Sequence, residues 1–332
     1  DGDADILVTG KWMGIHVFKN EKGTFAQQPT ATDAATGWWN SIAAADLDND
    51  GDMDYIVGNF GSNGYYNGTT QQPVQAFAND YDGNQRWDML LSTWKPATMQ
   101  STMKAFPVAY RDQLAEEIPS IKKQFPQFAE YAKTDIDQLL NPFNRQSELK
   151  LAASEFQSVW IENKGNFEFV LHPLPAAAQW SSVYGIVADD YNADGNLDIL
   201  LSGNEYSMHP YMGRMDASNG LLLQGDGNGN FAARSILQSG FYVPGNAKAL
   251  LQFPFAGSVA VLASQNGAAM QFFQLKQTTT VEAIPANTYA AILTLQNGKK
   301  RKVEFYYGSS FASQSARYVL KNASVVSVDF NK

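Results

Sequence analysis

The chain has 332 residues, of which 44% are hydrophobic and 17% are charged, and its acidic excess gives a formal net charge of −9. This charge argues against nucleic acid and anionic membrane surfaces as partners, since both require a basic face. The sequence has no cysteine, which excludes a disulfide framework, a thiolate metal site and a thiol nucleophile. No stretch approaches the ~20 apolar residues of a membrane-spanning helix, so we expect no direct membrane span.

A pattern of strand, acidic loop and strand recurs along the chain. Four segments place an aspartate at the end of an acidic stretch and continue with three apolar residues and a small one: residues 5–9, 54–58, 88–92 and 198–202. In three copies an apolar run also precedes the loop, and short apolar runs bounded by turn residues predict buried strands. The first copy is cut short at Asp1, so we expect the sequence to be a piece of a longer precursor.

Three predicted hairpins alternate with these units. Each has a polar turn that ends in Gly-x-Phe, at Val17–Phe25, Val159–Phe167 and Leu222–Phe231. The glycine permits a positive φ in the turn, and the phenylalanine is expected to start the return strand. Two inner strands and an outer hairpin make a four-stranded blade, and radial repetition of blades protects the sheet edges. The sequence therefore predicts an all-β fold, a β-propeller, with a degenerate last blade at Ala247–Leu275.

Two segments depart from the repeat. Apolar residues between Arg111 and Leu140 recur at helical spacing, and Pro119 and Pro126 divide this region into short helices. After residue 277, two apolar runs flank Asn297-Gly298, which predicts a hairpin in a small C-terminal β-element. We therefore expect propeller blades at 1–110, a helical insertion at 111–150, further blades at 151–276 and the C-terminal element at 277–332.

The loop at residues 46–54 has the oxygen spacing of a calcium site. Aspartates occupy loop positions 1, 3, 5 and 9, and glycine occupies position 6. Calcium binds about 6–8 oxygen ligands, and alternate positions of a tight loop point inward. A water and the backbone carbonyl at position 7 would complete the shell. We assign to this site Asp46, Asp48, Asp50, Asp52 and Asp54.

The same spacing returns in other loops, with about two to four calcium ions expected in total. The second site would use Asp190, Asn192, Asp194, Asn196 and Asp198. The third would use Asp80, Asp82, Asn84 and Asp88, with Gln85 in place of the glycine, which predicts a weaker site. Asp1 and Asp5 match positions 5 and 9 of an incomplete fourth loop.

Two other interpretations of these loops were weighed. Acidic turns can simply be solvated, but four carboxylates within nine residues repel one another and no basic residue lies between them. An EF-hand requires a glutamate at position 12 and flanking helices. Position 12 is Val57 in the first loop and Leu201 in the second, each within an apolar run. The loops are therefore expected to lie between strands.

These repeats and loops together resemble the FG-GAP/VCBS repeat of integrin-α-type propellers. The segment from Gly308 to Arg317 is similar to the signature of the ASPIC/UnbV module, and the segments 79–84, 111–140 and 213–218 resemble large surface proteins of Bacteroidetes-type bacteria. The resemblance implies a calcium-binding propeller in an exported, extracytoplasmic protein. It also implies a ring of about seven blades, of which about five are recognisable in this chain.

The sequence favours a binding module over an enzyme. It has no Gly-x-Ser-x-Gly elbow, phosphate loop or His-Glu-x-x-His motif. We expect a calcium-stabilised binding or assembly module that engages a glycan or a surface protein, as a component of a larger outer-membrane assembly. The alternative is a calcium-dependent polysaccharide lyase or hydrolase. Departures from a repeat are where individual function is added, which singles out the loop residues Tyr206, His209, Tyr211 and Arg214.

Overall fold

The computed structural model describes residues 3–98, 102–276, 278–285, 287–306, 308, 310–312 and 317–331. The protein is mostly β, with 43% of residues in strands and 10% in helices. The chain divides into two compact units. The larger comprises residues 1–34, 39–65 and 157–332, and the smaller comprises residues 35–38 and 66–156.

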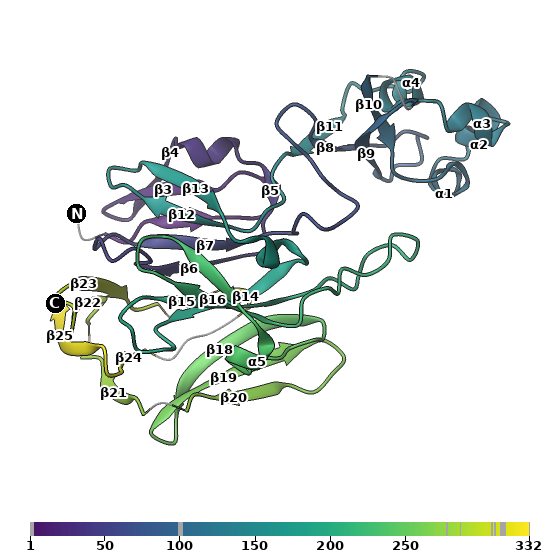
Figure 1. The fold of residues 1–332 in the computed structure, drawn as a ribbon. Coiled ribbons are helices and arrows are strands. Elements are labelled where there is room, and N and C mark those ends of the chain that lie inside the picture. The colour runs from purple at the N-terminus through teal and green to yellow at the C-terminus, as the bar shows by residue number, and fades with distance from the viewer. Residues whose placement is uncertain are drawn as a thin grey trace. The chain divides into compact units, whose positions relative to one another are not determined.

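The larger unit contains four successive antiparallel sheets (Figure 1). The first has the order β1 (Ile6–Val8), β3 (His16–Glu21), β4 (Thr24–Gln28). The second has the order β6 (Ser41–Ala45), β7 (Asp54–Gly58), β12 (Val159–Asn163), β13 (Phe169–Pro173). The third has the order β14 (Val183–Asp189), β15 (Asp198–Gly203), β16 (Leu221–Gly225), β17 (Phe231–Arg234). The fourth has the order β18 (Ala247–Phe255), β19 (Ser258–Gln265), β20 (Gln271–Gln274), where the sequence predicted a degenerate blade.

Apolar side chains join neighbouring sheets face to face. A buried cluster between the second and third sheets includes Ile56, Ile186 and Ile199. Another, between the third and fourth sheets, includes Leu200 and Leu250. Alternate residues of a strand point to opposite faces, so the third sheet supplies side chains to both clusters, with Ile199 in one and Leu200 in the other. No sheet in the part of the chain that the structure describes closes into a barrel.

The three predicted hairpins are present, with one difference in detail. Return strands begin near Phe25 and at Phe231 as expected, but the third begins at Phe169 rather than at Phe167. Phe167 instead lies in the turn with a φ of 61°. The Lys164 N–H donates to the carbonyl of Glu168, which closes the turn around residues 165–167. The turn therefore ends two residues later than the sequence predicted.

The C-terminal element forms two small sheets with a core of its own. Strand β22 (Ala290–Leu295) pairs with β23 (Lys300–Glu304) and with β25 (Val325–Asn331), and β21 (Thr280–Ala283) pairs with β24 (Tyr318–Lys321). The predicted hairpin at Asn297-Gly298 is confirmed, and Gly298 has a φ of 81°. Buried residues of this core are Ala291, Leu293, Leu295, Phe305 and Val319.

The smaller unit combines one sheet with four short helices. Its sheet has the order β10 (Met103–Pro107), β9 (Asp88–Pro96), β8 (Val74–Asn79), β11 (Leu149–Ala153). Its helices are α1 (Arg111–Glu117), α2 (Ser120–Gln124), α3 (Phe128–Tyr131) and α4 (Ile136–Leu140). As predicted, α1 and α2 end before Pro119 and Pro126, and the helices lie between strands of one sheet. Asp135 caps α4, because its carboxylate accepts from the Gln138 N–H.

The smaller unit is more extensive than the expected helical insertion at 111–150. It contains the acidic loop 80–88, which we expected in a propeller blade. The reason is that β11 returns to pair with β8, so the segment completes a sheet by itself. In the chain, residues 66–156 separate β7 from β12, which are neighbours in the second sheet of the larger unit.

The remaining elements are short. They are the strands β2 (Lys11–Met13) and β5 (Gly37–Trp38), the helix α5 (Ile236–Ser239), and the 3₁₀ turns η1 (Ala31–Ala34) and η2 (Ala176–Gln179). Among the described residues, none of the helices has the length and apolar character needed to cross a membrane.

Two leucines provide a matched test of this core assignment. Leu139 in α4 is fully buried, whereas Leu237 in α5 is 98% exposed. Leu139→Ala is expected to cost about 2–5 kcal/mol of unfolding free energy because it leaves a cavity. Leu237→Ala is expected to change it by less than about 0.5 kcal/mol. Denaturant unfolding followed by circular dichroism measures both, and equal losses would contradict the assignment.

Candidate metal centres

Three acidic loops have the same position between paired strands. They connect β6 to β7, β8 to β9, and β14 to β15. In each, the ninth residue pairs with the residue just before the loop: Ala45 with Asp54, Asn79 with Asp88, and Asp189 with Asp198. This shared register brings the two ends of the loop together and confirms the predicted arrangement of strand, loop and strand.

Backbone N–H groups inside the loops point toward the acidic side chains. The second residue donates to the Oδ2 of the ninth in every loop, at 2.9 Å from Leu47, 3.0 Å from Tyr81 and 3.2 Å from Tyr191. The N–H at position 5 donates to the side chain at position 3, and the N–H at position 7 donates to position 5. The loops therefore hold their side-chain oxygens on the inner side.

The sixth position requires a left-handed backbone in all three loops. Gly51 and Gly195 have φ values of 97° and 88°, and Gln85 has a φ of 67° in the third loop. A non-glycine residue adopts this region at a cost. At the fourth position the relation is reversed, because the third loop has Gly83 with a φ of 78° where the other two loops have Asn49 and Ala193 with φ values of 59° and 61°. Backbone strain therefore does not separate the third loop from the others, and its weaker calcium binding stays a prediction.

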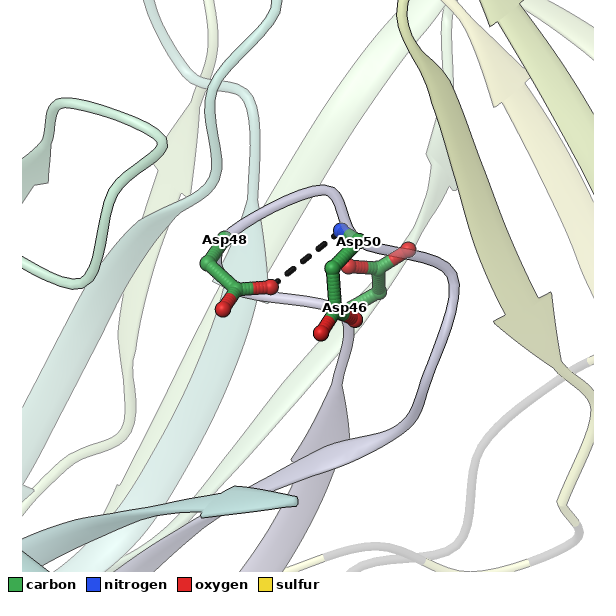
Figure 2. Close-up of side chains that lie close together, drawn as sticks. All are labelled: Asp46, Asp48 and Asp50. Carbon is green, nitrogen blue, oxygen red and sulfur yellow. Dashed lines mark hydrogen bonds between the residues drawn. The ribbon is translucent and has the colours of Figure 1, made fainter. Parts of the chain in front are cut away.

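The first loop brings three carboxylates together (Figure 2). Oxygens of Asp46, Asp48 and Asp50 lie within 4.8 Å of one another. Asp46 is fully buried, and its Oδ1 has no hydrogen-bond partner among the described residues. A buried, unpaired carboxylate oxygen is costly unless a cation meets it. Asp52 is exposed, and its N–H donates to Asp50.

Burial perturbs the acids of this loop. It raises the pKa of Asp46 to about 6, with a contribution from the Asp50 and Asp48 charges. Burial also raises the pKa of Asp54 to about 7, although N–H groups of Asn163 and Leu47 act in the opposite direction. Without a cation the charged forms are therefore unfavourable.

Asp54 also fastens the outer hairpin of its sheet. Its Oδ1 accepts from the Asn163 N–H at the end of β12, at 2.9 Å. The equivalent contacts join Asp198 to Gly225 at 3.0 Å and Asp5 to Asn20 at 2.8 Å. Asp5 thus makes the same contact as the ninth residues of the complete loops. Asp1, the other residue assigned to that incomplete loop, lies outside the described residues.

The second loop has one carboxylate fewer than the first at loop positions 1, 3, 5 and 9. Asn192 replaces an aspartate, and its amide donates to the Asp194 carboxylate at 2.8 Å. Burial raises the pKa of Asp198 to about 7. Three carboxylates do not converge here as they do in the first loop, within the part of the chain that the structure describes. Asn196 lies at position 7, where its N–H donates to Asp194.

The third loop lies in the smaller unit and again gathers three carboxylates. Oxygens of Asp80, Asp82 and Asp88 lie within 4.8 Å of one another. Asp88 is buried, and burial raises its pKa. The Asn84 N–H donates to both Asp80 and Asp82, at 3.0 Å and 3.1 Å.

The residues proposed to contact a ligand lie on the connection between β15 and β16. This connection extends beyond its sheet as a long arm (Figure 1). The Arg214 guanidinium lies 4.6 Å from the Tyr206 ring centre, and the rings of His209 and Tyr211 are 3.9 Å apart. The structure therefore groups the four residues as two pairs, of which His209, Tyr211 and Arg214 are exposed.

Several residues of the C-terminal element contact the acidic loops, and the sequence did not predict these contacts. The Lys302 N–H donates to Asp46 Oδ2 at 2.8 Å, and the Ser324 hydroxyl donates to Asp190 Oδ2 at 2.6 Å. Arg301 is buried between the loops and donates to the Gly195 carbonyl at 3.5 Å. No motif signals these contacts, because more than a hundred residues separate the partners.

A comparison with protein-family models found a match in the N-terminal part of the chain. Residues 1–57 match the FG-GAP-like repeat. The match spans the Asp5 strand, the first hairpin and the complete first loop, so it supports the FG-GAP part of the resemblance. FG-GAP repeats are generally non-catalytic and are typical of extracellular proteins. No curated protein matches the chain.

The raised pKa values of this FG-GAP-like region predict an unusual pH dependence for the metal-free protein. Asp46 and Asp54 titrate near about 6 and about 7 when folded, against about 3.9 in an unfolded chain. The folded state therefore binds more protons in this range, and its stability falls as the pH rises toward about 7. Thermal unfolding in chelator, between about pH 5 and pH 8, measures this trend.

Calcium provides the control for that experiment. A bound cation favours the charged carboxylates, so excess calcium is expected to remove the decline. Carboxyl groups with a lowered pKa, such as Glu205, stay ionised throughout this range. Stability in chelator that increased with pH would contradict the expected trend.

Proposed function

We propose that this chain is a calcium-stabilised extracytoplasmic module that binds a partner and has no catalytic role of its own. The observation that carries the calcium part is the first loop. Three carboxylates converge there, and the Oδ1 of the fully buried Asp46 has no hydrogen-bond partner among the described residues. A hard, oxygen-binding cation provides the missing interaction.

The donor set of the first loop fits calcium. Asp46, Asp48 and Asp50 offer side-chain oxygens, Asp54 lies at the ninth position, and a water and the Asp52 carbonyl would complete the shell. Calcium accepts about 6–8 oxygens in flexible geometry, whereas magnesium requires a near-octahedral set. The ion would supply positive charge that offsets the mutual repulsion of these carboxylates.

The second and third loops are proposed as further calcium sites of the same kind. Their registers and internal hydrogen bonds match those of the first loop. The third gathers three carboxylates, as the first does. The second offers Asp190, Asn192, Asp194 and Asp198, with an amide oxygen in place of one carboxylate.

A propeller ring of about seven blades is the larger architecture that we propose. The fourth sheet of the larger unit supports further blades, because its outward face is apolar. Phe253, Phe255 and Phe272 gather on that face, and the last two are 44% and 48% exposed. The C-terminal element is proposed to be an ASPIC/UnbV-like module, and the protein to be a surface protein of a Bacteroidetes-type bacterium.

The arm between β15 and β16 is the proposed contact surface for a glycan or a surface protein. Blade sheets pack on one another, so loops are what remain for a partner. Tyrosine, histidine and arginine side chains stack on sugar rings and anchor protein interfaces. Those of His209, Tyr211 and Arg214 are exposed on the arm.

Calcium binding has a direct test in thermal stability. A cation that binds only the folded state adds about 2.7 kcal/mol at a hundredfold excess over its dissociation constant. Calcium is therefore expected to raise the melting temperature above that in chelator, and magnesium to do so less. An unchanged melting temperature in chelator would refute the proposal.

Two variants of one loop localise this effect. Asp46→Asn is expected to reduce the calcium-dependent rise in melting temperature, because it removes a converging carboxylate. Asp52→Asn is the matched control, since the Asp52 side chain is exposed and its backbone carbonyl is unchanged. Equal responses of the two variants would place the ion elsewhere.

Binding by the arm is tested with a double variant. Tyr206→Ala with Tyr211→Ala is expected to lower affinity for a native surface polysaccharide or co-purifying protein by at least tenfold, about 1.4 kcal/mol. Deletion of residues 111–150 is the comparison variant, and Tyr242→Ala, another exposed tyrosine, is the matched control. Undiminished binding by the double variant would place the surface elsewhere. Shortening of the polysaccharide by the intact protein would instead support the alternative of a lyase or hydrolase.

A further inference from the structure

Two acidic loops of the larger unit are contacted by the C-terminal element at the same position. Lys302 donates its N–H to Asp46 Oδ2 at 2.8 Å, and the two residues lie 256 positions apart. Ser324 donates its hydroxyl to Asp190 Oδ2 at 2.6 Å, across 134 positions. Asp46 and Asp190 are both the first residue of their loop. The element therefore holds one carboxylate oxygen of the first residue in each loop.

The Lys302 contact uses a backbone group that its own sheet leaves free. Lys302 lies in β23, which is an edge strand of the sheet β23-β22-β25. Edge strands present N–H groups that have no partner within the sheet. Because Asp46 Oδ2 accepts from this N–H, the carboxylate is fixed in orientation and its other oxygen, Oδ1, remains unpaired inside the loop.

The Ser324 contact comes from the turn between β24 and β25. Ser324 is buried, and the neighbouring Asn322 donates its amide to the Asp190 carbonyl at 3.0 Å. The turn thus holds both the side chain and the backbone of Asp190. Side chains that orient metal ligands through hydrogen bonds affect affinity strongly.

Arg301 adds charge between the two loops. It is 4% exposed, and its Nε has no hydrogen-bond partner among the described residues. Burial lowers its pKa, against the opposing effect of the carboxylates of Asp189, Asp190, Asp46 and Asp194. The guanidinium therefore lies in the negative field of both loops, which favours docking of the element to the metal-free loops. A bound cation weakens this attraction, so the coupling proposed below depends on the contacts of Lys302 and Ser324 that orient the carboxylates, and not on Arg301.

Apolar packing between the element and the sheets is incomplete. A cavity of about 230 Å³ lies between them, lined on one side by Ala45, Ile186 and Leu250 and on the other by Leu293, Val303 and Val319. This cavity is partly open to solvent, so the apolar faces do not meet over their full area. Polar contacts add to the packing, both at the loops and at Ser310 and Tyr318, which bond to Tyr184 and Gln252 of the sheets.

The third loop has a different arrangement. The carboxylate of Asp80 accepts from N–H groups of its own loop: those of Gly83 at 2.8 Å, Asn84 at 3.0 Å and Gln85 at 2.8 Å. Asp190 accepts from its own loop in the same way, from the Asp194 N–H at 3.1 Å and the Gly195 N–H at 2.9 Å, and accepts from Ser324 in addition. The third loop differs in that, among the described residues, its first residue has contacts from its own loop only, and it therefore provides an internal comparison for the other two.

We propose that the C-terminal element positions the first ligand of the two loops in the larger unit, and that its docking and calcium binding there strengthen each other. The loop of the smaller unit binds calcium independently of the element. This inference rests on the proposed function, since it requires calcium in the loops. Coupling between two binding events is reciprocal, so calcium must also tighten the docking of the element.

Hydrogen–deuterium exchange during a calcium titration tests both directions in the full chain. Peptides that cover residues 46–54, 80–88 and 190–198 report each loop separately. Ser324→Ala is expected to raise the calcium concentration at half-protection of residues 190–198 by about tenfold. The 80–88 peptide is expected to keep its midpoint. Ser327→Ala is the matched control, because Ser327 is an exposed serine of the same element.

The first loop has its own variant. Lys302→Pro removes the N–H that Asp46 accepts and is expected to shift the midpoint of residues 46–54, again with no change in residues 80–88. Proline is tolerated on an edge strand where the N–H faces away from the sheet. The unchanged third loop and the Ser324→Ala variant keep the test valid if proline disturbs β23.

The reverse effect, that of calcium on the docking of the C-terminal element, is measured on peptides of the element itself. Peptides covering residues 300–304 and 318–325 are expected to lose protection when calcium is chelated. The loss is expected again with Asp46→Asn at saturating calcium, but not with Asp80→Asn. The inference would be overturned if Ser324→Ala and Lys302→Pro left the calcium midpoints of the loops unshifted and calcium did not change the exchange protection of the element. If no loop of the unaltered protein gained protection with calcium, the proposed function would fail instead.

Discussion

Crowding of carboxylates inside a short turn is the constraint on which the larger unit depends. The register of β6 with β7, and of β14 with β15, places the first and ninth aspartates of a loop beside each other at the end of two buried strands. Burial raises the pKa of Asp54 and of Asp198 to about 7, so the charged loop is unfavourable on its own. Backbone N–H groups offset part of this cost, and the remainder is relieved by protonation or by a cation in the proposed sites.

The ninth aspartate links this electrostatic problem to the fold. In the first three sheets of the larger unit it accepts an N–H from the adjacent strand, which is the first strand of the outer hairpin: that of Asn20, Asn163 or Gly225. One carboxylate therefore closes the loop and fastens the outer hairpin of the same sheet. The charge of the loop and the attachment of the outer hairpin are consequently linked within each of these sheets.

The loops resemble one another in backbone but differ in what surrounds them. The C-terminal element donates hydrogen bonds to Asp46 and Asp190. Asp190 also accepts N–H groups of its own loop, as Asp80 does. Arg301 gives that element a buried positive charge close to both loops. We therefore propose that the same motif serves as an independent site in the smaller unit and as part of an interface in the larger one. The exposed arm between β15 and β16 remains the proposed partner surface.

Local pattern was sufficient for the elements and the loops of this protein. Apolar runs and turn residues predicted the paired strands, Pro119 and Pro126 predicted the ends of α1 and α2, and Asn297-Gly298 predicted its hairpin, because each depends on interactions between residues close in sequence. Aspartate spacing likewise predicted which side chains share a loop. Only the tertiary structure decided that β11 returns to β8, which assigns loop 80–88 to the smaller unit. It alone also placed Lys302, Arg301 and Ser324 beside Asp46 and Asp190, because an edge N–H, a buried guanidinium and a turn hydroxyl acquire these partners only when distant segments pack together.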